Sequence, residues 1–249
     1  MQYLSRSLLY KTRVSLGLTL IPFFRMFSLT LFKAILIAIL VVFLSQRLRC
    51  TAITGGIGSG KSTAVQFIRD TFPSVATFDC DEAARLALAK GSPAYSVVVK
   101  AFGPQVLTSP NQEIDRKSLS TLIFNDANKR HALNAIVHPG VFFAMFKTMF
   151  IEGLVKGRRV LVDIPLLFES PWYIQGLFYP RILIACTQET QIKRVMKRNK
   201  DSTAEEVQKR LHAQMSLSDK MLLADFAVPN EEDVQYMQDK LLTIWSITG

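Results

Sequence analysis

The segment Gly55–Ser62, Gly-Gly-Ile-Gly-Ser-Gly-Lys-Ser, limits the possible folds of this chain more than any other feature. It matches G-x-x-x-x-G-K-S/T, the phosphate-binding loop (P-loop) of enzymes that bind nucleoside triphosphates. Its glycines let the backbone curl so that successive N–H groups point at phosphate oxygens, and the following helix contributes the positive end of its dipole. In such a loop Lys61 reaches the β- and γ-phosphates, while the Ser62 hydroxyl binds Mg²⁺.

The segments on both sides of the loop give it the setting that a P-loop needs. Cys50–Thr54 has the composition of a short buried strand, and Thr63–Phe72 has the apolar spacing of an amphipathic helix. A chance Gly-rich turn would not be expected between such a strand and such a helix. We therefore predict that the loop binds ATP through Gly56, Ile57, Gly58, Ser59, Gly60, Lys61, Ser62 and Thr63.

Strands and helices alternate along the rest of the chain, as in parallel sheets built from βαβ units. Further strands are predicted at Val75–Phe78, 161–163, Arg181–Cys186 and Phe226–Val228. Helical patterns fill the segment between the second and third strands, near Pro93–Phe102, Lys117–Phe124 and Lys129–Gly153. A crossover needs only about a dozen residues. The sequence therefore predicts an α/β fold, a parallel sheet flanked by helices, with an inserted helical substrate subdomain at about 91–153.

Three carboxylates follow predicted strands, where open α/β sheets bind ligands. Asp163 stands at the end of a buried strand and is the candidate Mg²⁺ ligand, although a strand-end turn aspartate remains the alternative. Asp79 and Asp81 follow the second strand and are expected to face the same cleft. Because residues two apart after a strand can cap a helix as well as serve a site, one of these two is expected to be an N-cap.

Arg194 and Arg198 are spaced four apart in a basic stretch with a helical pattern. Residues at this spacing lie on one face of a helix. An arginine pair so placed can clamp a triphosphate in a closing lid. A solvated basic face remains the alternative, because that is the commoner meaning of such a run.

The distribution of charge argues against a nucleic-acid partner, although the formal net charge is +10. Residues 1–50 contain seven Lys and Arg and no acidic residue, so the remainder carries 23 basic against 20 acidic side chains. A net charge of +3 is ordinary for a domain that handles anionic ligands. The three cysteines show no metal-ligand spacing and are expected to be reduced thiols, mostly buried.

Residues 1–48 form a separate N-terminal segment whose central part has the composition of a membrane span. Met26–Leu44 is a 19-residue apolar run with one charge, Lys33. As a helix it covers ~28 Å, close to the ~30 Å hydrocarbon core. Its apolar side chains contribute roughly −4 to −8 kcal/mol to insertion, against about +3 for a central lysine. We therefore predict a transmembrane anchor at about 26–44, ahead of a catalytic domain at 49–249.

Met1–Arg25 is basic, contains serines and lacks acids, as mitochondrial presequences do. The same residues could equally form the basic flank of a signal anchor. Attachment to a mitochondrial membrane is therefore favoured, with the cytoplasmic face of another membrane as the alternative. The topology stays open because basic residues flank both ends of the span. Nothing in the sequence indicates a protein partner.

Beyond the P-loop, a series of short motifs resembles the dephospho-CoA kinase family over about 200 residues from Arg49 onward. In chain order these are Thr54–Thr63, Asp79-x-Asp81-x-x-x-Arg85, Phe102-Gly103, Asp115-Arg116-x-x-Leu119, Leu133-Asn134 followed by His138-Pro139, Pro165-Leu-Leu-Phe-Glu169, the pair Arg194/Arg198, and Gln214. The P-loop alone would indicate only a superfamily, whereas the other motifs in this order are more specific. The N-terminal extension departs from the family pattern, as does Pro229, which stands where the family usually has a polar residue.

The resemblance implies a P-loop kinase fold and phosphorylation of the ribose 3′-hydroxyl of dephospho-CoA by ATP, giving coenzyme A and ADP in the last step of CoA biosynthesis. Asp81 would take or orient the proton of the acceptor hydroxyl. Lys61 and the arginines of a lid at about 190–215, Arg194 and Arg198, would stabilise the transferring phosphoryl group, with Arg198 also on ATP.

The residues themselves indicate Ser62 and Asp163 as the ligands of Mg²⁺. From the residues, His138-Pro139 is interpreted as a helix-interrupting turn beside a substrate surface, with a neutral structural histidine. Residues implied to contact dephospho-CoA are Thr54, Asp79, Asp81, Arg85, His138, Pro165 and Leu166.

Two other functions remain open at this point. A nucleoside-monophosphate kinase, or another small-molecule kinase, would share the P-loop and the lid. A membrane-tethered nucleotide-binding protein without catalysis would need neither Asp81 nor the lid arginines, and the retention of all these residues argues against it.

Overall fold

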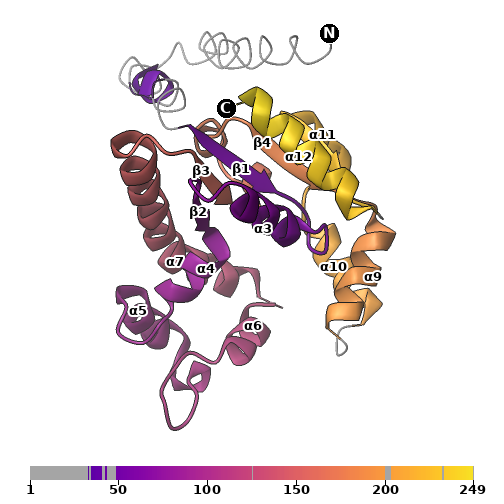
Figure 1. The fold of residues 1–249 in the computed structure, drawn as a ribbon. Coiled ribbons are helices and arrows are strands. Elements are labelled where there is room, and N and C mark those ends of the chain that lie inside the picture. The colour runs from indigo at the N-terminus through magenta and orange to yellow at the C-terminus, as the bar shows by residue number, and fades with distance from the viewer. Residues whose placement is uncertain are drawn as a thin grey trace, which may run out of the picture. The chain divides into compact units, whose positions relative to one another are not determined.

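The computed structural model describes residues 33, 35–40, 43, 49–124, 126–199, 203–231 and 233–248. The chain divides into two compact units (Figure 1). Unit 1 joins the described residues up to Thr77 to those from Glu152 onward, and unit 2 is Phe78–Ile151.

A five-stranded sheet forms the centre of unit 1, in the order β2-β3-β1-β4-β5. Strand β1 pairs in parallel with β3 and β4, and β4 pairs in parallel with β5. Every residue of β1, β3 and β4 is buried, because helices cover both faces of such a sheet. This confirms the α/β prediction. The strands are β1 (Cys50–Thr54), β2 (Ala76–Asp79), β3 (Val160–Asp163), β4 (Arg181–Ala185) and β5 (Phe226–Pro229).

Two helices from opposite ends of this domain pack in the same core. Helix α3 (Lys61–Thr71) follows the P-loop, and α12 (Val234–Thr248) ends the described chain. Phe72 stacks on Trp245 with ring centroids 5.4 Å apart. The Arg159 guanidinium lies 3.7 Å from the Trp245 ring centroid and donates to the Trp245 carbonyl and the Thr248 hydroxyl. These contacts fix the C-terminal helix to the start of β3.

Short helices complete unit 1, and polar caps mark where they begin. Thr187 caps α9 (Gln188–Arg198), and Thr203 forms a capping box with Glu206 at α10 (Ala204–His212). Ser216 caps α11 (Leu217–Leu223). A 3₁₀ turn, η4 (Leu167–Glu169), and α8 (Trp172–Gln175) lie between β3 and β4.

Unit 2 is helical and has its own apolar core, which includes Val98, Phe102, Leu119 and Val137. Its longest helix, α7, packs against α4, α5 and α6. A π-helix, η3 (Met149–Val155), continues α7 without a break. The other elements are α4 (Cys80–Ala87), α5 (Pro93–Phe102), the 3₁₀ turn η2 (Pro104–Val106), α6 (Arg116–Phe124) and α7 (Ala127–Thr148).

The helix-interrupting turn predicted at His138-Pro139 is wrong. Helix α7 runs through Pro139 without interruption. An interior proline removes one hydrogen bond and costs about 3 kcal/mol. The buried residues Leu133, Val137, Val141 and Met145 recur every four positions, on one face. Burying each of them contributes roughly 1.5–3 kcal/mol, which exceeds the cost of the proline.

The membrane span predicted at 26–44 lies largely outside the described residues. Of that segment the structure describes Lys33, 35–40 and Phe43, all helical, so the transmembrane helix is not supported here and stays a prediction. Among the described residues, Ala127–Val155 is long and apolar enough to cross a membrane, with a mean hydropathy of 1.3. Three of its residues, Leu133, Val137 and Val141, belong to the core of unit 2.

The buried pair Arg181–Asp225 provides a test of what holds the sheet together. The Asp225 carboxylate accepts hydrogen bonds from the Arg181 Nε and Nη2, both at 2.9 Å, and from its backbone N–H at 2.8 Å. Arg181→Met would leave this carboxylate buried without the guanidinium. We expect a loss of about 3 kcal/mol in the free energy of unfolding, measured by urea denaturation.

A matched control is Lys156→Met, which removes an exposed lysine from an ion pair with Glu152. The urea midpoint of this variant should stay close to that of the unmodified protein. Equal midpoints for the two variants would contradict the structural importance of the buried pair.

Candidate active site

The P-loop joins the end of β1 to the start of α3, as the sequence predicts. The N-cap of α3 is Gly60, with φ 90° and ψ 15°, and no side chain caps this helix end. No acidic residue lies in its first turn. The N–H groups at the helix start therefore have no side-chain cap, which is the arrangement that binds phosphate.

Close packing around the loop explains two of its glycines. Gly58 has a φ of 75°, and a Cβ there would lie 2.8 Å from the Gln191 carbonyl oxygen. Gly60 has a φ of 90°, and a Cβ there would collide with the Asn230 amide nitrogen. Both positions need the left-handed backbone and the missing side chain.

Lys61 and Asp163, predicted separately as site residues, are brought together. The Lys61 ammonium donates to Asp163 Oδ1, and the two side chains are 12% and 6% exposed. The register of the sheet produces this contact, because Asp163 ends β3 directly opposite Ile53 of β1. The carboxylate and the phosphate-binding lysine thus share the carboxyl edge of the sheet.

Arg194 supports the P-loop rather than pointing into open space. Its guanidinium donates to three backbone carbonyls, those of Ser59 (3.5 Å), Asn230 (2.9 Å) and Glu231 (2.5 Å). Asn230 donates from its amide to the Ser59 carbonyl as well, at 2.7 Å. Arg198, the other predicted lid arginine, is exposed in the last turn of α9.

The predicted substrate residues of unit 1 lie where β1 and β3 end. The Thr54 hydroxyl donates to the Pro165 carbonyl at 3.2 Å, and Leu166 is 47% exposed. Further along this loop, Glu169 forms an ion pair with Lys220 at 3.1 Å and accepts the Met215 N–H at 3.0 Å. Sequence reasoning assigned no role to Lys220 or Asn230, because contacts with distant residues and with backbone atoms leave no spacing pattern.

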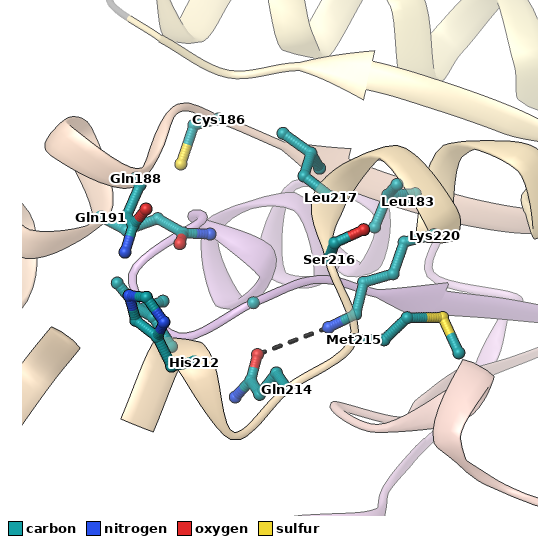
Figure 2. A pocket seen from close by; sticks show the side chains of 12 residues that line it. Leu183, Cys186, Gln188, Gln191, His212, Gln214, Met215, Ser216, Leu217 and Lys220 are labelled. Atoms are coloured by element: carbon teal, nitrogen blue, oxygen red, sulfur yellow. Dashed lines mark hydrogen bonds between the residues drawn. The ribbon is translucent and has the colours of Figure 1, made fainter. Parts of the chain in front are cut away.

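A pocket of about 320 Å³ opens beside Gly56 (Figure 2). It is lined by the P-loop, the end of β4, α9 and the turn between α10 and α11. Burial raises the pKa of the Cys186 thiol in its wall to about 11, so this cysteine is neutral near pH 7. The polar side chains that face it include Gln191, Gln214 and Lys220.

The site residues predicted in unit 2 occupy two helices. Asp79 is the N-cap of α4 and accepts the N–H groups of Asp81 and Glu82, at 2.8 and 3.0 Å. Asp81 is exposed in the first turn of this helix, and Arg85 is exposed one turn later. His138 is exposed on α7 and makes a T-shaped contact with Phe142, with ring centroids 5.9 Å apart.

The oxygen atoms available at the P-loop suit a hard divalent cation. Among the described residues no group of three or more His, Cys, Asp or Glu could hold a metal. Mg²⁺ does not require such a group, since it usually takes one or two protein oxygens, waters and substrate phosphates. The Ser62 hydroxyl in the first turn of α3 and the Asp163 carboxylate supply oxygens of that kind.

A parallel sheet whose first strand leads through a phosphate-binding loop into a helix places this chain among the P-loop proteins that bind nucleoside triphosphates. The model of the dephospho-CoA kinase family matches residues 49–235. A dephospho-CoA kinase of Bacillus cereus is 40% identical over 201 residues, covering 78% of this chain and 96% of that protein. That of Geobacillus kaustophilus is 40% identical, covering 77% and 92%.

Solved structures agree in fold. The crystal structure of TT1252 from Thermus thermophilus has a TM-score of 0.65 and 29% identity, covering 80% of this chain and 96% of that one. A dephospho-CoA kinase from Campylobacter jejuni has a TM-score of 0.60 at 24% identity, with the same coverage. The chain belongs to the dephospho-CoA kinase family, and it is a kinase that requires a divalent metal with ATP.

Gly60→Ala tests the geometry of the loop. A Cβ at this position would meet the Asn230 amide and force a left-handed backbone on alanine, so we expect ATP binding to weaken at least about 10-fold. Titration calorimetry with a non-hydrolysable ATP analogue measures this.

Gly91→Ala is the matched control. Gly91 has a φ of 88°, almost that of Gly60, but nothing lies within 4 Å of its Cβ position. This variant should carry a similar backbone strain of about 1–2 kcal/mol and bind the analogue normally. Equal binding losses in both variants would mean that strain, not the loop, controls affinity.

Proposed function

We propose that this chain transfers the terminal phosphoryl group of ATP to the ribose 3′-hydroxyl of dephospho-CoA, giving coenzyme A and ADP. The observation that carries the proposal is the P-loop whose Lys61 meets Asp163 at the strand ends, within a chain that belongs to the dephospho-CoA kinase family. Phosphoryl transfer of this kind needs positioning and charge stabilisation more than covalent chemistry.

The P-loop residues hold the donor. The N–H groups at the start of α3 donate to phosphate oxygens, and the Lys61 ammonium moves from Asp163 to the β- and γ-phosphates. Mg²⁺, held by Ser62 and Asp163, would neutralise charge on the phosphates. Arg198, exposed at the end of α9, would add a further cation from the lid.

Asp81 is the group proposed to handle the acceptor proton. Its position in the first turn of α4 is fixed by Asp79, which caps this helix through two backbone N–H groups. Within the described residues the Asp81 carboxylate forms no hydrogen bond or ion pair, so it is available to accept the proton of a 3′-hydroxyl. Positioned proton transfer contributes about 10²–10⁴ to rate.

The substrate assignment is tested by ATP consumption with the full chain, using dephospho-CoA, AMP, CMP or no acceptor, with Mg²⁺ or with excess chelator. Turnover with dephospho-CoA alone, lost on chelation, is the expected result. Turnover with a nucleoside monophosphate instead would move the chain to that class of kinase. ATP binding without turnover on any acceptor would favour a non-catalytic role.

Asp81→Asn tests the acceptor side separately. We expect kcat to fall about 10²–10⁴-fold while the dissociation constant of an ATP analogue changes little, because Asp81 lies outside the P-loop. Steady-state kinetics and calorimetry together separate the two effects. Glu82→Gln, one residue further along the same exposed helix turn, is the control. A near-normal kcat in Asp81→Asn would remove Asp81 from the mechanism.

We also propose that residues 26–44 anchor the kinase in a membrane, with the mitochondrion favoured and the cytoplasmic face of another membrane as the alternative. The support is the apolar run in the sequence, together with the exposure of Leu36, Ile37, Ile39, Leu40 and Phe43, each 47–55%.

Carbonate extraction of cell membranes tests the anchor. The full chain should remain in the membrane pellet, and a variant with Lys33 retained but Ile37 and Leu40 changed to Asp should be released. Release of both proteins would contradict an anchor, and organelle fractionation would then identify the compartment of a soluble enzyme.

A further inference from the structure

A buried lysine beside the P-loop has no part in the mechanism described so far. Lys220 on α11 is 3% exposed, although lysine is rarely buried without a reason. Its ammonium forms an ion pair with Glu169 at 3.1 Å and donates to Gln214 Oε1 at 3.4 Å. Figure 2 shows this side chain in the pocket wall, directed at Gln214.

The three residues join two segments that are distant in sequence. Glu169 ends η4, the turn that follows β3, while Gln214 and Lys220 lie on either side of the start of α11. Glu169 Oε1 also accepts the Met215 N–H at 3.0 Å. The Glu169 carboxylate therefore holds the segment after α10 in two ways. It accepts the Met215 N–H directly, and through Lys220 it holds the Gln214 side chain.

This arrangement determines how Gln214 faces the P-loop. A lysine ammonium has only donors, so Lys220 donates to the Gln214 amide and the carbonyl oxygen of that amide accepts. Gln214 Oε1 lies 3.5 Å from the position that a Cβ on Gly56 would take. Because Lys220 donates to this same oxygen, the bond holds the Gln214 side chain in place beside the P-loop.

Stability alone does not explain the pair. Replacing a buried ion pair by apolar groups is often neutral or stabilising, because desolvation of the two charges offsets their attraction. Apolar side chains, Leu183 and Leu217, line the same pocket, so an apolar residue at position 220 would have apolar neighbours. The ion pair instead fixes the position of the turn before α11 and of the Gln214 amide.

We propose that Lys220 and Glu169 are positioning residues, which hold the segment 213–216 and the Gln214 amide against the P-loop so that the lid closes over the phosphates in one geometry. The inference rests on the proposed phosphoryl transfer. Misplacement of a positioning group by about 1 Å can cost 10²-fold in rate. A lid that closes imperfectly also admits water to the activated phosphoryl group.

Lys220→Met in the full chain tests this, because methionine keeps an unbranched chain and removes the charge. We expect kcat to fall about 10–100-fold with less than about a 3-fold change in KM for ATP. The fraction of ATP hydrolysed to water, relative to phosphoryl transfer, should rise. A lysine that only supported the fold would lower the melting temperature without moving this fraction.

Two further variants complete the design. Glu169→Gln still accepts the Met215 N–H but loses its charge, and it should change kcat and the hydrolysed fraction in the same direction. The double variant should be no worse than Lys220→Met, because the two residues act as a unit. Lys209→Met, on the exposed surface of α10, is the control and should behave as the unmodified kinase.

Hydrogen exchange separates this inference from the choice of acceptor. Mg²⁺ with the imido analogue of ATP should slow exchange over 213–217 in the unmodified chain, and Lys220→Met should lose most of that protection while still binding the analogue. This measurement tests the positioning role of Lys220 even if dephospho-CoA is not the acceptor. If Lys220→Met does not fold, Glu169→Gln carries the same measurements. Unchanged protection with an unchanged kcat and hydrolysed fraction, or losses shared by Lys209→Met, would overturn the proposal.

Discussion

The rest of the site depends on how the P-loop backbone is held before a nucleotide arrives. A loop that turns its N–H groups inward toward phosphate must turn carbonyls outward, and those carbonyls need donors of their own. The Ser59 carbonyl receives two, from the Asn230 amide and the Arg194 guanidinium. Protein donors therefore hold this part of the loop backbone in place before phosphates bind, as electrostatic preorganisation requires.

The same contacts separate the two lid arginines by function. Arg194 reaches three carbonyls at the P-loop and the end of β5, so α9 is fastened to the sheet at this point. Arg198 lies one turn further along the helix and is exposed. Arg194 is therefore held by the backbone beside the P-loop, whereas Arg198 is the arginine to which we assign contact with the phosphates in the proposed mechanism. Spacing alone made the two arginines look equivalent.

Sequence reasoning predicted the strands well because parallel strands buried on both faces are short, continuous apolar runs, as in Val160–Val162. It also placed Asp163 at a strand end, which is all that its contact with Lys61 requires. It was wrong at Pro139, where it predicted a turn, because the packing of α7 outweighs the local preference of proline. It could not find Asn230, Lys220 or the contact of Arg159 with Trp245, since each depends on a partner about 50 or more residues away. The N-terminal span is the part of the prediction that lies largely outside the described residues.

Two buried or nearly buried lysines, Lys61 and Lys220, each meet a carboxylate close to the P-loop. Such pairs are weak sources of stability, so stability does not explain why both lie close to the P-loop. Lys61 lies at the start of α3, and under the proposed mechanism it would exchange Asp163 for phosphate and leave the carboxylate to a divalent cation. Lys220 is held by both Glu169 and Gln214. If its ammonium changed partners, the turn before α11 would lose these contacts. Under the proposed mechanism the first pair would change partners during the reaction, whereas the second would stay in place.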